Sequence, residues 1–266
     1  MGRPARSNAG ERNTALSPLE RRSRESNLAW GARAVAEMQT GDATKWSYIV
    51  LLGGNDTTAF RLRLAQSHLR GDMLPSYWSD VLMVELVDAS VVGALAWHVP
   101  LTQPGPPEFP PRSNGVVRRP LKDFARVDRY PNIAVIALPT PQESVLARIR
   151  MFMEHRGTLD ALEHVLRWQG FCWGVARAPN PLHENYGIPS ACMLEIACAA
   201  EQFDLTPGVE ARASTPEAIW AAAGHWHEYY ERTQDGLRPM GRFTTRHRYP
   251  IFHPDNEAGD RTTLRG

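Results

Sequence analysis

The sequence predicts an α+β fold in which an antiparallel sheet packs against helices. Two apolar runs, residues 46–52 and 133–138, have the length and composition typical of strands buried on both faces. Residues 80–87 and 93–101 are rich in β-branched and aliphatic side chains and are separated by a short polar segment, so we expect neighbouring strands joined by a turn. Apolar residues elsewhere recur at helical spacing. A sheet with separate helices follows from these patterns.

The chain divides by composition into three parts. Residues 1–45 are predicted to form a flexible basic arm, up to about residue 25, and a short amphipathic helix that packs beside the core. Residues 46–234 carry the strands and helices of the main domain. Residues 235–266 are polar and punctuated by Pro and Gly, so we expect a tail with a strand near residues 248–252.

Helix signals within the main domain are local. Asp56 and Gly71 are predicted to begin and end a helix, and Pro216 follows two hydroxyl residues that can cap another. Five prolines between residues 104 and 111 predict an exposed loop. The remaining expected elements are a strand at Val116 and Val117, a helical turn at 121–127, and helices at 140–155, 159–168 and 218–231.

Composition limits the possible functions. The chain of 266 residues has 30 basic and 29 acidic residues, so its net charge of +1 gives no overall attraction to nucleic acid or to an anionic membrane. Its three cysteines do not resemble a disulfide framework and are expected to be free thiols. No apolar signal peptide or membrane span is recognisable, so we expect synthesis in the cytoplasm, without excluding signal-independent export. No cofactor or metal site is predicted, and the sequence does not indicate the oligomeric state.

The segment 186–195 carries two candidate nucleophiles. Pro189 suits the first position of a helix, which places Ser190 and Cys192 in the first turn. A helix N-terminus lowers the pKa of a thiol and stabilises an oxyanion. The alternative is a structural serine and a packed thiol, the commoner outcome for a cysteine without an obvious partner.

The order of elements resembles the circularly permuted papain-like hydrolases of the NlpC/P60 superfamily, including the YiiX-like group. Residues 76–84 are similar to the Ser-x-aromatic-Ser-His-Val-x-Ile-Val strand that delivers the catalytic histidine of that family. Residues 115–121 are similar to its Gly-Val strand and following turn, and residues 189–196 to its nucleophile helix. Segments 205–208 and 215–217 resemble its later Pro-containing helix start. The resemblance implies a papain-like domain over residues 46–231.

This chain departs from the family at both catalytic positions. Asp80 stands where the family has histidine, and an aspartate is a weak base with an ordinary pKa of about 3.9. Spacing to the apolar residues behind favours Ser190 as the nucleophile, whereas chemistry favours Cys192. His98, on the strand expected beside Asp80, is a candidate base with Asp80 as its orienting partner, and His183 is a second candidate. For both histidines a packing or surface role is the alternative.

Two functions follow as expectations. The first is thiol-type hydrolysis by an amidase or peptidase, with a peptide or amide substrate, and the resemblance implies cell-wall peptides. It requires Ser190 or Cys192 to lie in one cleft with Asp80 or His98. The second is a catalytically silent papain-like module used for binding or assembly.

Overall fold

The computed structural model describes residues 15–38, 40–87, 90–105, 113–174, 178–230 and 237–245. Within these residues seven strands form one mixed sheet in the order β1-β7-β6-β2-β3-β4-β5. The strands are β1 (Leu16–Pro18), β2 (Ser47–Gly53), β3 (Asp80–Val87), β4 (Ser90–His98), β5 (Val117–Pro120), β6 (Asn132–Leu138) and β7 (Met240–Thr244). All neighbours are antiparallel except β1 and β7, which are parallel. The predicted α+β class is therefore confirmed.

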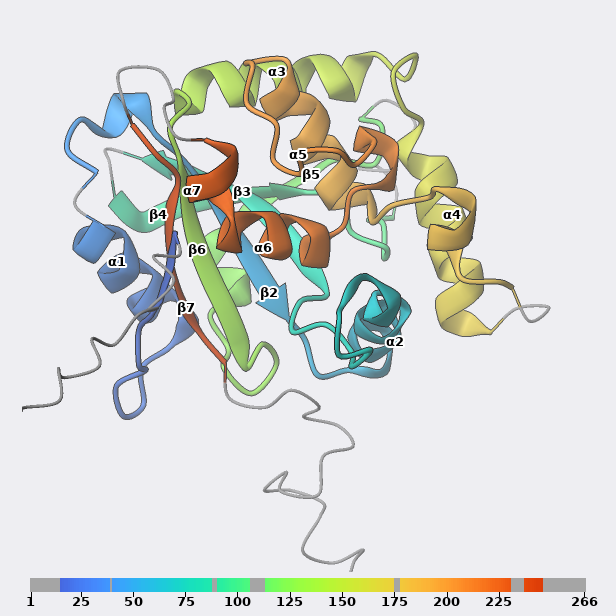
Figure 1. Ribbon diagram of the computed structural model, residues 1–266, viewed down its shortest axis with the longest axis horizontal. Coiled ribbons are helices and arrows are strands. Elements are labelled where there is room, and N and C mark those ends of the chain that lie inside the picture. The colour runs from blue at the N-terminus through green and yellow to red at the C-terminus, as the bar shows by residue number, and fades with distance from the viewer. Residues whose placement is uncertain are drawn as a thin grey trace, which may run out of the picture.

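Helices cover both faces of this sheet (Figure 1). The α-helices are α1 (Asn27–Met38), α2 (Thr57–Ala65), α3 (Gln142–Glu154), α4 (Ala161–Trp173), α5 (Pro189–Ala199), α6 (Pro216–Gly224) and α7 (Trp226–Tyr229). The short 3-10 helices are η1 (Ala43–Lys45), η2 (Ser67–Leu69), η4 (Leu121–Phe124), η6 (Pro181–Glu184) and η7 (Ala211–Ala213).

The sheet separates two apolar cores. On one face, α3, α5 and α6 pack against alternate residues of the central strands, and we call this the α5-side core. On the other face, α1 and η4 form the α1-side core. In β3, Val81 and Met83 belong to the α5-side core, whereas Leu82 and Val84 belong to the α1-side core. This alternation is the ordinary consequence of strand geometry.

Several local predictions are confirmed because their signals are short-range. Asp56 caps α2 by accepting a hydrogen bond from the backbone N–H of Ala59 at 2.8 Å. Pro189 is the first residue of α5, as predicted. The strands at 80–87 and 93–101 form the expected antiparallel pair, β3 and β4, although β4 begins earlier, at Ser90.

Other expectations need correction. The N-terminal arm contributes β1, and the tail contributes β7, so the sheet extends beyond both expected domain boundaries. Neither strand is recognisable alone, because each depends on pairing with a distant partner. Helix α1 does more than pack beside the core, since its Trp30 and Ala34 are fully buried. The predicted helix 218–231 is interrupted at His225, between α6 and α7.

Two expected features lie outside the described residues. They are most of the proline-rich loop, residues 106–112, and the strand expected near residues 248–252.

Gly53, at the end of β2, lies where the loop before β3 passes closely, and replacing it should destabilise the fold. A methyl group there would collide with the carbonyl oxygen of Tyr77 and come 2.9 Å from the Cβ of Asn132. We expect Gly53→Ala to lower the free energy of unfolding by about 1–3 kcal/mol, as overpacking does in other cores. Urea denaturation measures this change. Gly71→Ala, which meets no atom within 4 Å, is the control and should not be destabilising.

Candidate functional site

A cavity of about 370 Å³ lies at one end of the sheet, and we call it the strand-end cavity. Asp80 is the first residue of β3 and His98 is the last of β4, so antiparallel pairing brings both to this end. Its walls come from α2, from the segment between η4 and β6, and from the start of α5. The lining residues are Asp56, Thr58, Ala59, Leu62, Ser79, Asp80, His98, Val99, Pro100, Leu101, Thr102, Arg119, Asp123, Phe124, Arg129, Tyr130, Ile188 and Pro189.

Asp80 and His98 form a pair in this cavity. The Nδ1 atom of His98 lies 3.2 Å from Oδ2 of Asp80, whose other oxygen accepts the backbone N–H of Val81 at 2.9 Å. An ionised carboxylate only accepts hydrogen bonds, so Nδ1 carries the hydrogen and the Nε2 of a neutral ring is an acceptor. This Nε2 is buried and has no hydrogen-bond partner among the described residues. The ring of Phe124 packs edge-on against His98, with 5.4 Å between ring centroids.

Ser190 is fully buried and holds α5 against the end of β4. Its hydroxyl accepts a hydrogen bond from the backbone N–H of Val99 at 3.1 Å and donates to the carbonyl oxygen of Val99 at 3.2 Å. Val99 lies just past the last residue of β4, where the ladder no longer pairs the backbone. The hydroxyl therefore satisfies both polar groups of one buried residue, which is a structural role.

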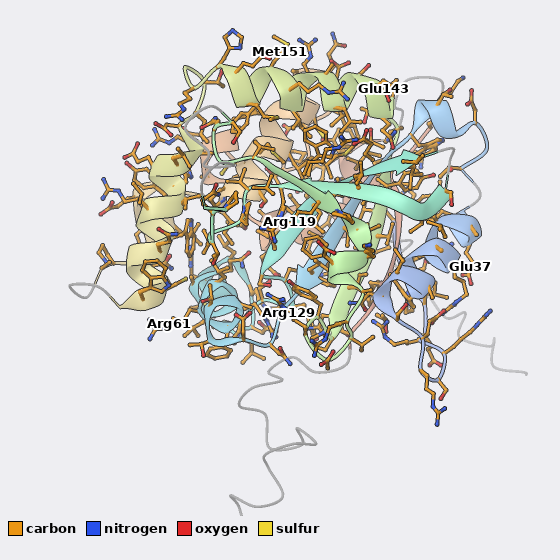
Figure 2. The ribbon with its side chains drawn as sticks, turned by 180° about the vertical axis from the view of Figure 1, so that it is seen from behind. Glu37, Arg61, Arg119, Arg129, Glu143 and Met151 are labelled. Atoms are coloured by element: carbon orange, nitrogen blue, oxygen red, sulfur yellow. The ribbon has the colours of Figure 1, made fainter. Side chains whose placement is uncertain are left out.

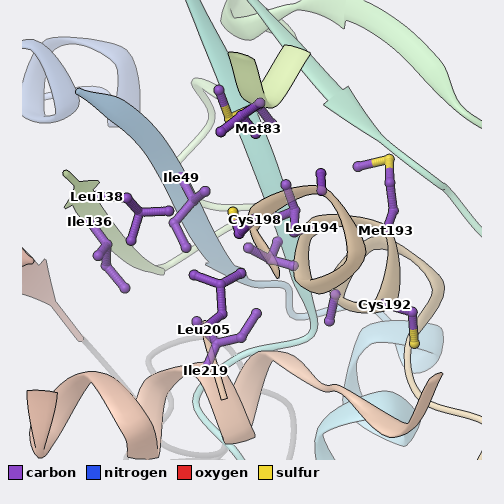
Figure 3. Packing of buried hydrophobic residues seen from close by; sticks show 14 of the residues in the cluster. Ile49, Met83, Ile136, Leu138, Cys192, Met193, Leu194, Cys198, Leu205 and Ile219 are labelled. Carbon is purple, nitrogen blue, oxygen red and sulfur yellow. The ribbon is translucent and has the colours of Figure 1, made fainter. Parts of the chain in front are cut away.

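Cys192 is fully buried on the side of α5 that points away from the sheet (Figure 3). Its Sγ lies 3.2 Å from the carbonyl oxygen of Arg212 and 4.0 Å from Nδ1 of His164. That nitrogen lies 3.0 Å from the carbonyl oxygen of Gly187, so it donates its hydrogen there and has no lone pair for the thiol. Burial raises the pKa of Cys192, and the nearby charge of Glu195 adds to the effect. The thiol is therefore packed and protonated.

The expected meeting of nucleophile and base does not occur. Asp80 is paired with Leu52 in the sheet and lies on the same face as Leu82. Leu52 and Leu82 both belong to the α1-side core. His98 likewise shares the face of Ala96 and contacts Phe124. Helix α5 packs on the opposite face, so Cys192 belongs to the α5-side core. Neither Ser190 nor Cys192 lines the strand-end cavity, because only Ile188 and Pro189 reach it from this helix start.

The remaining histidine candidate, His183, lies elsewhere. It is exposed in η6, where its ring contacts that of His68 at 5.6 Å, and it does not line the strand-end cavity. The structure instead adds Arg119, Arg129 and Tyr130 to the cavity, which the sequence patterns did not single out. The only local signal for Arg119 was its place in a short strand. Alternation along that strand places Arg119 on the same face as Val117, which pairs with His98.

Glu195, in the second half of α5, carries a deeply buried carboxyl group. Its two oxygens accept the backbone N–H groups of Leu205 and Thr206 at 2.9 and 3.3 Å and the hydroxyl of Thr206 at 2.6 Å. Burial raises the pKa of Glu195 to about 7, and a hydrogen bond with Asp204 acts in the same direction. Glu195 thus fastens the loop before η7 to α5, and its raised pKa is a consequence of its burial in the fold.

Comparison with protein-family models, with curated proteins and with solved structures finds no match to this chain. In the part of the chain that the structure describes, no helix combines the length and apolar character needed to cross a bilayer. The same described residues contain no group of three or more His, Cys, Asp or Glu side chains placed to hold a metal ion.

Removing the Ser190 hydroxyl should destabilise the protein, because Val99 would keep two buried polar groups without partners. We expect Ser190→Ala to lower the free energy of unfolding by about 1–3 kcal/mol in urea denaturation. The matched control is Ser67→Ala, which removes a hydroxyl bonded to the Leu64 carbonyl at the surface. That change should stay within about 0.5 kcal/mol. Equal effects of the two substitutions would contradict the structural role of Ser190.

Stability should fall as pH rises through the range in which Glu195 loses its proton. Its folded-state pKa of about 7 lies above the ordinary value of 4.5, so the folded protein binds the proton more tightly than the unfolded chain. The stabilisation that Glu195 contributes is complete below pH 4.5. It is lost as the pH rises towards 7, by up to roughly 3 kcal/mol. Glu195→Gln should flatten this part of the profile of unfolding free energy against pH. An unchanged slope in the variant would rule out Glu195 as its source.

Proposed function

We propose that this chain is a catalytically silent binding module of the permuted papain-like type, with the strand-end cavity as its binding site. The observation that carries the proposal is that both candidate nucleophiles are buried and hydrogen-bonded to backbone groups. Ser190 is bonded to Val99, and Cys192 lies against the carbonyl oxygen of Arg212. A papain-type hydrolase needs an accessible thiolate in contact with a histidine.

The sequence resemblance and the helix start support the papain-like part of this proposal. Helix α5 begins at Pro189 beside the cavity and packs on the sheet, as a nucleophile helix would. Thiol hydrolysis, the activity that the resemblance implies, has little support from the geometry. Burial raises the pKa of Cys192, Cys172 and Cys198, so no thiol among the three is poised as a thiolate at neutral pH.

The Asp80–His98 pair favours one specific alternative, which is hydrolysis with water as the nucleophile. An oriented histidine with an unbonded Nε2 is the usual form of a general base. This Nε2 is buried, however, and Phe124 packs against the ring, so a water molecule would need an opening of that contact. Binding without turnover therefore accounts better for the arrangement.

Thiol labelling tests the silent module directly. With all three thiols buried and protonated, we expect iodoacetamide at neutral pH to label Cys192, Cys172 and Cys198 slowly and at similar rates in the folded protein. Mass spectrometry of peptides from a time course measures each rate, and labelling in urea provides the fully accessible control. Selective, fast labelling of Cys192 would favour the cysteine hydrolase instead.

Activity assays complete the test. The wild-type protein should not hydrolyse peptide, ester or muropeptide substrates above background. Turnover that His98→Ala and Asp80→Asn abolish, but Cys192→Ser leaves intact, would replace the silent module by the water-activating alternative. Turnover lost in Cys192→Ser would restore the thiol mechanism.

A further inference from the structure

Two arginines line the strand-end cavity without a carboxylate partner. Arg119 comes from β5 and Arg129 from the segment before β6, and Figure 2 labels both on the same side of the molecule. Within the described residues, neither guanidinium forms an ion pair or a side-chain hydrogen bond. Neighbouring arginines differ, since Arg118 pairs with Glu85 at 3.0 Å and Arg126 pairs with Asp128. Unpaired guanidinium groups at a cavity are the usual donors to carboxylate and phosphate oxygens.

Tyr130 adds a neutral donor to the lining of the same cavity. The guanidinium of Arg129, an exposed residue, lies over the Tyr130 ring, 5.4 Å from its centroid. Burial raises the pKa of Tyr130, so its phenol keeps the hydrogen at neutral pH. The hydroxyl has no hydrogen-bond partner among the described residues. Its hydrogen is therefore available to a ligand oxygen.

The three carboxylates that line the cavity form no ion pair with these arginines among the described residues. Asp80 is bonded to His98 and to the backbone of Val81, and Asp56 caps α2, where a helix N-terminus favours its negative charge. Asp123 is exposed and forms no ion pair with either arginine within the described residues. The guanidinium donors of Arg119 and Arg129 are thus not taken up by these carboxylates and can bind a ligand.

Part of the lining is apolar. Leu62 of α2, Phe124 of η4 and Ile188 before α5 come from three different walls of the cavity. A ligand that fills this space would bury an apolar body against these walls while its charged group meets the arginines.

We propose that the strand-end cavity binds an anionic ligand with an apolar body, whose carboxylate or phosphate group is held by Arg119, Arg129 and the hydroxyl of Tyr130. This inference rests on the proposed function, because it names the ligand class of the same cavity. It assigns the binding energy to charge recognition and leaves the Asp80–His98 pair out of the contact with the anion.

Three probes with six carbon atoms each test the charge requirement without any variant: hexanoate, hexyl phosphate and the neutral hexanamide. Titrations followed by NMR should show both anions binding at least about tenfold more tightly than hexanamide. A hydrogen bond to a charged group contributes about 1.5–3 kcal/mol, and about 1.4 kcal/mol corresponds to a tenfold change in affinity. Tighter binding of hexyl phosphate identifies phosphate as the preferred group, and tighter binding of hexanoate identifies carboxylate. Equal binding of hexanamide would overturn the inference.

Substitutions locate the anion. Arg119→Ala and Arg129→Ala should each weaken binding of the preferred anion by about tenfold or more, and Tyr130→Phe by a smaller factor. Arg118→Ala is the matched control, because it removes the same charge from the neighbouring residue of β5 on the opposite face. It should leave binding unchanged. Loss of binding in Arg118→Ala equal to that in Arg119→Ala would refute the site.

The two proposals fail separately. Hydrolysis of any substrate by the wild type would overturn the silent module, whatever the probes do. Absence of anion binding up to millimolar concentrations, with no turnover and slow thiol labelling, would overturn only the anionic ligand class.

Discussion

The strict alternation of side chains across the sheet is the constraint on which the rest of this site depends. Because Asp80 opens β3 and His98 closes β4, antiparallel pairing joins them at one end, on the face that also carries Leu82 and Ala96. Helix α5 covers the other face. A side chain cannot change face without a shift of register, so the pair and the buried thiol of Cys192 are kept apart by the geometry of the strands themselves.

Hydrogen bonding at the start of α5 reinforces this separation. The first turn of α5, which carries the candidate nucleophile Ser190, holds a group that satisfies the backbone instead, since Ser190 bonds to Val99 where the β4 ladder ends. Cys192 and Glu195 fasten the loops that follow, the first through a carbonyl oxygen and the second through two backbone N–H groups. Serine, cysteine and glutamate can all act in catalysis, but here their side chains are buried as hydrogen-bond partners of backbone groups.

The strand-end cavity is where polar groups remain without internal partners. Arg119, Arg129 and Tyr130 line a space whose walls are partly polar and partly apolar, and His98 contributes a buried nitrogen that has no hydrogen bond among the described residues. Arg119 is half-buried and Arg129 is exposed, so both guanidinium groups are accessible to a ligand in the cavity. Binding of an anion explains these side chains more simply than a reaction that lacks an accessible nucleophile.

The sequence by itself determined the elements with local signals. Apolar runs identified β2 and β6, Asp56 and Pro189 identified two helix starts, and the neighbouring strands β3 and β4 made contact between Asp80 and His98 predictable. Only the tertiary structure decided which face α5 covers, that β1 and β7 join the sheet, and that Arg119 and Arg129 line the cavity that holds Asp80 and His98. Periodicity and capping depend on residues a few positions apart, whereas the face that a helix covers and the partner of an edge strand depend on packing between distant segments.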